Sequence, residues 1–166
     1  NRTIVFSYVR STQGRIPMLN RVAITGIGII SCIGNNLDVV GESLRKGTSG
    51  IVVDHKRKEL GFRSPLTGMI RDFDAKKVLP RKHLKTMPEF AIQAYAAVVD
   101  ALEMSGLSRE DIEGPETGII FGCDSSCIAA VEQVDLMRRY GESKSIGSGL
   151  VFRSMTSSIT MNLNVL

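Results

Sequence analysis

Two glycines follow a short apolar stretch near the start of the chain, in a pattern that can hold a nucleotide phosphate. Val22–Thr25 leads directly into Gly26, and Gly28 completes a G-x-G pair. A dinucleotide fingerprint needs a third glycine where this chain has Ser31, and an acidic residue about 20 residues further on, after a second strand, which this chain lacks. We therefore interpret the glycines as residues that let the chain turn tightly after a strand.

The three cysteines and two histidines do not have the spacing of a metal site. Cys123 and Cys127 are four residues apart, but a zinc site would need a second pair of ligands. Cys32, His55 and His83 are scattered along the chain. We expect no metal site, and we expect the cysteines to be small buried apolar residues. A nucleophilic role would need a base that is distant in the sequence.

Basic residues form a second candidate site. Arg81, Lys82 and Lys85 are spaced to share one edge of a helical turn. Residues 55–85 contain ten Lys and Arg against three acidic residues, whereas residues 86–137 contain ten Asp and Glu against one Arg. This separation indicates a local field for an acidic or phosphorylated partner, and a solvated face is the alternative.

Length and composition set the class of protein. The chain has 166 residues, of which 43% are hydrophobic and 23% charged, as in an ordinary globular domain. The net charge of +4 includes three arginines and no acid in residues 1–20, so the remaining 18 basic and 17 acidic residues indicate no nucleic-acid partner. No apolar run approaches the ~18 residues of a membrane span, so we expect no membrane insertion. An odd number of cysteines favours the cytoplasm.

The elements that would position these residues begin with a strand and a helix. We expect a buried strand at Val22–Thr25 and then a helix with Leu37, Val40 and Leu44 on one face. Asn35 or Asn36 would cap this helix, and Lys46-Gly47 would end it. Residues 48–87 are irregular and broken by prolines, so no element is predicted there.

The second half continues this alternation of elements. Pro88 fits the first position of a helix over Glu89–Met104 that is packed on several sides. Thr117–Gly122 reads as a second strand, and Ile128–Tyr140 as an amphipathic helix. An α/β fold with parallel strands joined by helical crossovers is the natural arrangement. The remaining predicted features are a capped turn at Ser108–Asp111, a flexible link at Gly141–Gly149 and an apolar pattern at Leu150–Leu166.

Several stretches, taken together, resemble one enzyme family. RVAITGIGIISCIGNN, followed by a helix and GTSGI, resembles the opening of β-ketoacyl-acyl-carrier-protein synthases, the condensing enzymes of fatty-acid synthesis. The resemblance continues in order through PRKHLKTMPEFAIQAYAAVVDAL, GLSREDI, TGIIFG and SGLVFRSMTSSITMNLNVL, over about residues 19–166. It is closest to the elongating synthase I and II classes. It implies a thiolase-like α/β fold of two similar halves, of which this chain, with a mixed sheet and packed helices, would be most of the first.

The resemblance also implies a reaction. The family condenses an acyl group with malonyl-carrier protein to form 3-oxoacyl-carrier protein and CO2, through a cysteine nucleophile and two histidines. None of Cys32, Cys123 and Cys127 occupies the family's nucleophile motif, which should begin after Leu166. We therefore expect this chain by itself to be inactive. No cofactor is implied, because the substrates are carried on the phosphopantetheine of acyl carrier protein.

Some binding positions of the family fall within this chain. Ser125 matches a position that lines the acyl pocket, where many members have glycine, and Met155 matches a pocket residue near the dimer interface. The basic surface for the acidic carrier protein matches Arg81, Lys82, Lys85 and Lys144. The implied partners are acyl carrier protein and, for the complete protein, a second copy in a homodimer.

The boundaries of the chain are also predicted. Residues 1–17 show no clear period, and Met18 resembles a natural start, so we expect 1–17 to be a non-native extension and 18–166 a truncated ketosynthase N-terminal domain. Two alternatives stay open. One is a non-catalytic partner subunit of the chain-length-factor type, in the fatty-acid or a polyketide pathway. The other is an unrelated nucleotide-binding α/β module.

Overall fold

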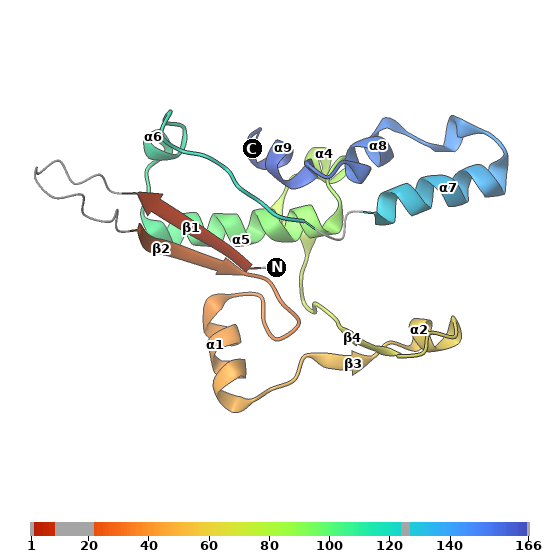
Figure 1. Ribbon diagram of the computed structural model, residues 1–166, viewed down its shortest axis with the longest axis horizontal. Coiled ribbons are helices and arrows are strands. Elements are labelled where there is room, and N and C mark those ends of the chain that lie inside the picture. Colours follow the sequence, from red (N-terminus) through yellow and green to blue (C-terminus); the bar gives the residue numbers. More distant parts are fainter. Residues whose placement is uncertain (1, 9–21, 124–126, 166) are drawn as a thin grey trace, which may run out of the picture. The chain divides into compact units, whose positions relative to one another are not determined.

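The computed structural model describes residues 2–8, 22–123 and 127–165, which form two compact units (Figure 1). The first unit comprises residues 1–73 and 96–107, and the second comprises residues 74–95 and 108–166. Helix α5 (Glu89–Ser105) contributes its first residues to the second unit and the rest to the first. Each unit is described by itself.

Strand β2 (Val22–Ile29) confirms the first predicted strand and is longer than predicted. It pairs antiparallel with β1 (Arg2–Tyr8), from Tyr8 opposite Val22 to Arg2 opposite Ile29. The prediction that this strand is buried is wrong for its first half, because Val22 and Ile24 are largely exposed and burial begins at Gly26. β1 lies within the segment predicted to be an extension, and its origin stays a prediction.

Gly26 and Gly28 lie inside β2, not in a turn after it, so the prediction of turn glycines is wrong. A Cβ on Gly26 would overlap the carbonyl of Ala101, and a Cβ on Gly28 would overlap the carbonyl of Ala97, both on α5. Both alanines are fully buried. The glycines are therefore required by a close approach of the strand backbone to the helix backbone.

Helix α1 (Leu37–Lys46) is bounded by the predicted caps at both ends. The Asn36 side chain accepts a hydrogen bond from the Val39 N–H at 2.9 Å, and Gly47 ends the helix at φ 64°. Of the predicted apolar face, only Val40 is buried, while Leu44 is largely exposed.

Five short elements lie in residues 48–87, where no element was predicted, and the first three belong to the first unit. β3 (Ile51–Val53) pairs antiparallel with β4 (Leu66–Gly68), and α2 (His55–Glu59) lies between them in sequence. Both strand pairs among the described residues are therefore antiparallel, and the predicted parallel strands with helical crossovers are not found there. An antiparallel partner can be reached through a local connection and needs no crossover helix.

The second unit is mainly helical. Its buried apolar residues include Met87, Ala91, Ile92 and Ala94, which precede or begin α5, and also Leu79, Ala129 and Ile159. The helix predicted at Glu89–Met104 is confirmed and ends one residue later. The other elements of the second unit are α3 (Ala75–Val78), α4 (Arg81–Leu84), α6 (Arg109–Ile112), α7 (Ile128–Tyr140), η1 (Ser143–Ser145), α8 (Ser148–Ser154) and α9 (Ser158–Leu163).

The strand predicted at Thr117–Gly122 is wrong, because the structure assigns no strand to these residues. Ile120 is 98% exposed, and no strand within the described ranges pairs with the segment. A strand is stabilised by hydrogen bonds to a neighbour, so β-prone residues without a neighbour remain irregular.

Candidate functional site

The predicted basic edge is formed by α4 and the residue that ends it. Arg81 and Lys82 lie in α4 and Lys85 is its C-terminal cap, so the expected helical turn is confirmed. All three side chains are exposed, and none forms an ion pair with a carboxylate in the described part of the chain. We call these three residues the α4 patch. No described carboxylate pairs with its charge, and the partner that it would bind stays a prediction.

Contacts with α8 position the chain segment that carries the α4 patch. Gly149, in α8, approaches the Lys85 carbonyl so closely that a Cβ there would lie 2.8 Å from the oxygen. The Arg153 Nε donates to the Met87 carbonyl at 3.4 Å, and Met87 is buried. The chain just after α4 is therefore held against α8.

Lys144 differs from the α4 patch because it has a local counter-ion. Its Nζ lies 3.5 Å from the Glu142 carboxylate, and both side chains are largely exposed. An exposed pair of this kind contributes little to stability, but it partly neutralises the charge. The carrier-binding role of Lys144 stays a prediction, with weaker local support than that of the α4 patch.

The predicted acyl-pocket residues are only partly described. Met155 is the C-terminal cap of α8 and is moderately exposed, and its N–H donates to the Phe152 carbonyl at 3.3 Å. Ser125 lies outside the described residues. Both roles stay predictions.

The first unit contains a hollow that the sequence analysis did not predict. It has a volume of about 390 Å³ and opens broadly to solvent. The Asn35 amide donates to the Arg71 carbonyl at 2.6 Å, while the other Asn35 side-chain atom, Oδ1, is buried and has no hydrogen-bond partner among the described residues. Neither Gly26 nor Gly28 lines this hollow, so it gives no support to a nucleotide site. Its lining consists of residues 31–36, Val39, residues 48–50, Arg71 and Asp72.

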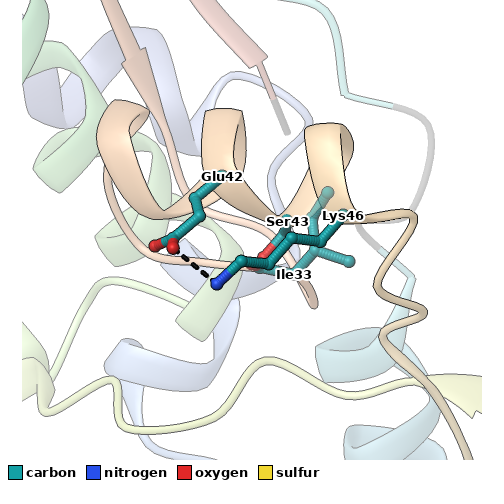
Figure 2. A network of polar contacts seen from close by, with 4 residues as sticks. All are labelled: Ile33, Glu42, Ser43 and Lys46. Carbon is teal, nitrogen blue, oxygen red and sulfur yellow. Dashed lines mark hydrogen bonds and ion pairs between the residues drawn. The ribbon is translucent and has the colours of Figure 1, made fainter.

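Hydrogen bonds fix the helix beside this hollow (Figure 2). The Ser43 hydroxyl donates to the Ile33 carbonyl at 2.8 Å, which ties α1 to the loop after β2. Lys46 and Glu42 form an exposed ion pair at 2.6 Å along the same helix. The first bond crosses ten residues and therefore positions the loop, whereas the ion pair is local to the helix.

The three cysteines differ in exposure. Cys32 and Cys123 are partly buried, whereas Cys127 is exposed just before α7, so the expectation that the cysteines are buried is wrong for Cys127. Within residues 2–8, 22–123 and 127–165, no group of three possible metal ligands is found. In the same part of the chain, no helix is long and apolar enough to cross a membrane.

Two carboxyl groups have altered acidity. The pKa of Asp111 is lowered because its side chain accepts hydrogen bonds from the Ser108 hydroxyl and backbone N–H. The pKa of Asp100 is raised by partial burial and by the charge of Glu103. Asp111 belongs to the capping box of α6 and Asp100 lies on α5, so both shifts are explained by local structure.

Comparison with known proteins shows which protein family the chain matches. The family model described as "Beta-ketoacyl synthase, N-terminal domain" matches residues 19–165. The 3-oxoacyl-(acyl-carrier-protein) synthase 1 of Buchnera aphidicola subsp. Acyrthosiphon pisum (strain APS) is 34% identical over 151 residues, covering 89% of this chain and 37% of the relative. The synthase 1 of Escherichia coli (strain K12) is 34% identical over 144 residues, covering 86% of this chain and 35% of the relative. The chain thus spans little more than a third of these relatives.

Solved structures agree on the fold. A β-ketoacyl synthase from Burkholderia phymatum STM815 superimposes with a TM-score of 0.72 at 21% identity, over 85% of this chain and 35% of that chain. The ishigamide ketosynthase/chain length factor superimposes with a TM-score of 0.70 at 23% identity, over 81% of this chain and 34% of that chain. The predicted thiolase-like α/β fold is confirmed.

Proposed function

Because the chain belongs to the β-ketoacyl synthase family, we propose that the protein it represents is an elongating ketosynthase of fatty-acid or polyketide synthesis. It condenses acyl-carrier protein with malonyl-carrier protein to give 3-oxoacyl-carrier protein and CO2. The match of the family's N-terminal domain to residues 19–165 is the observation that carries this proposal. The 34% identity to a 3-oxoacyl-(acyl-carrier-protein) synthase 1 supports the substrate class.

The proposed reaction has two covalent steps. A cysteine thiolate attacks the acyl thioester, takes the acyl group and releases the carrier-bound phosphopantetheine as a thiolate, which takes up a proton from solvent. Malonyl thioester then loses CO2, and the resulting carbanion attacks the acyl-cysteine carbonyl, which forms the new C–C bond and frees the thiolate. Backbone N–H groups stabilise the thioester oxyanion. The substrates ride on phosphopantetheine, and we propose no other cofactor.

This chain would supply scaffold and docking surface to that reaction, not the nucleophile. Its cysteines do not match the family motif, and the carbonyl and Sγ of Cys32 lie tightly against Gly50. We propose that the α4 patch binds the acidic carrier protein, because its three cations are exposed and without described counter-ions. Such charges raise the association rate and orient the complex, and salt weakens them. We place the complete protein in the cytoplasm as a homodimer.

Acyl transfer tests the proposal directly. The chain and the complete protein are incubated separately with acyl-carrier protein and malonyl-carrier protein, and protein mass and 3-oxoacyl product are measured. We expect product and one acylated cysteine only with the complete protein, and no acyl group on Cys32, Cys123 or Cys127. A complete protein that binds carrier protein but is never acylated would instead be a non-catalytic partner of the chain-length-factor type.

A further inference from the structure

The edge of β2 that pairs with β1 plays no part in the proposed reaction. The two strands lie side by side in the first unit and form a two-stranded sheet (Figure 1). Their pairing extends along the whole of β2, from Val22 opposite Tyr8 to Ile29 opposite Arg2. The family model begins at residue 19, so β2 lies inside the matched domain and β1 lies outside it. The edge of β2 is therefore covered by a segment that does not belong to the matched domain.

The sequence of β2 contains nothing that would protect this edge. Its eight residues, VAITGIGI, include no proline and no charged residue. Proteins usually place such residues on edge strands, because an open row of N–H and C=O groups pairs readily with another strand. Val22 and Ile24 are also 60% and 54% exposed. Protection of the edge therefore depends on β1.

Helix α5 holds β2 in its extended form. A Cβ on Gly26 or on Gly28 would overlap carbonyl oxygens of α5, so the strand lies directly against the helix backbone. The Ile27 N–H donates to the Met104 Sδ of α5 at 3.4 Å and not to β1. Because these contacts are made by α5, they do not require β1. Without β1, β2 would remain a pre-formed template for another strand.

β1 is an imperfect partner for β2. Val5 lies opposite Gly26 and Phe6 opposite Ile24, so Thr25 is an extra residue in β2 with no counterpart in β1. The Thr25 hydroxyl oxygen is buried and forms no hydrogen bond within the described part of the chain. A buried polar atom without a partner lowers the stability of the pair. In the same part of the chain β1 pairs with no strand except β2, so it can be displaced without disrupting another strand pair.

We propose that the edge of β2 is a strand-binding surface that β1 covers, and that this edge binds β2 of a second copy when β1 is released. Two β2 strands related by a twofold axis run antiparallel and present the same edge to each other, so the pairing closes as a dimer. Pairing with β1 is intramolecular and is therefore favoured at low protein concentration. The surface is independent of the proposed reaction.

Two features favour a second copy over other occupants of the edge. β2 has no charged residue, so charge neither attracts an oppositely charged partner nor repels an identical strand. A strand of another protein would need an unpaired edge of its own, which folded proteins avoid. Release of β1 instead opens the same edge on every copy of this chain, so a matching partner is always present.

Proline substitutions in β1 of the full chain test the proposal. Ile4→Pro with Val5→Pro removes two consecutive N–H donors, one of which points toward β2. Ser11→Pro with Thr12→Pro is the matched control, outside β1. We expect the β2 amides to exchange about tenfold faster in the β1 variant at low concentration, and to regain protection as dimers form at high concentration. Hydrogen exchange and sedimentation velocity measure both effects, and the control should behave like the parent chain.

A peptide of residues 1–8, added to the β1 variant, should restore the protection of β2 and dissociate the dimer. The same peptide with prolines at positions 4 and 5 should do neither. Unchanged exchange in β2 of the variant would overturn the covering role of β1. Faster exchange that never returns at high concentration would overturn the second copy as occupant. A dimer that persists with the peptide would place the interface elsewhere and overturn the proposal.

A disulfide lock gives a second test that does not depend on the folding of the proline variant. Phe6→Cys with Ile24→Cys places two cysteines opposite each other in the register, together with Cys123→Ser and Cys127→Ser. The oxidised chain should show no concentration-dependent protection of β2, whereas the reduced chain should associate like the parent. Equal association through β2 in the oxidised and reduced chains would show that β1 does not cover the surface.

Discussion

Two regions of the first unit use glycine for a close approach, but only one of them is buried. The first is the contact of β2 with α5, and the second is the arm of β3, α2 and β4 (Ile51–Gly68), which we call the basic arm. At β2, Gly28 brings the strand against the backbone of α5, and Ile29 beside it is buried. At the arm, Gly68 seats the base on Cys32, yet Val53 further along is exposed. Both segments contain Ile and Val, so residue type alone does not explain the difference in burial, which follows from the presence of a partner element.

The largest expected effect comes from blocking the close approach at β2. Gly28→Ala places a methyl group into the Ala97 carbonyl, and neither backbone can move freely, so the free energy of unfolding should fall by about 3 kcal/mol or more. Urea unfolding of the chain measures this. Gly122→Ala is the matched control, because no described atom beyond its two chain neighbours lies within 4 Å of its Cβ position, and it should be nearly neutral. Equal losses in both would contradict the packing explanation.

Removing one apolar side chain from each region sharpens the comparison. Ile29→Ala should lower the free energy of unfolding by about 2 kcal/mol, because it leaves a cavity in a buried position. Val53→Ala should change it by less than about 0.5 kcal/mol, because the side chain already faces solvent. Thermal unfolding of the two variants in parallel gives the difference. A large loss for Val53→Ala would mean that the arm is covered in solution.

Gly68→Ala tests the contact between the base of the arm and Cys32. The new methyl group would meet the Cys32 side chain at 3.1 Å, and that side chain can move, so we expect a loss of about 1 kcal/mol, confined to the arm. Amide hydrogen exchange should show faster exchange in β3 and β4 only. Faster exchange throughout β2 would show that the two regions unfold together.

The smallest expected effect is a pH dependence at the capping box of α6. The folded-state pKa of Asp111 is depressed below its ordinary value of 3.8, so its contribution to stability is complete above that pH and is lost as pH falls through the lower folded value. The hydrogen bond from the Ser108 hydroxyl is the largest cause of this shift. Ser108→Ala removes it and should return the Asp111 pKa toward 3.8. An NMR titration of the Asp111 carboxyl measures both values. An unchanged pKa in the variant would exclude the hydroxyl as the cause.

Local signals in the sequence predicted the helices well. Asn36 and Gly47 bound α1, and Ser108 caps α6 in the turn predicted at Ser108–Asp111, because these interactions join residues a few positions apart. The alanine-rich stretch of α5 was recognised for the same reason. The α4 patch was also found from spacing alone, since one helical turn brings its cations to one edge.

Strands and burial required the tertiary structure. Thr117–Gly122 has a β-prone sequence but no partner strand among the described residues, and β3 and β4 form in a stretch where no strand was predicted. The family motifs in the sequence determined the fold class, and neighbours in sequence determined the helices and their caps. The role of Gly26 and Gly28 and the exposure of β3 and β4 were decided only by tertiary structure. Each of these depends on which distant residue lies alongside, and no local pattern specifies that.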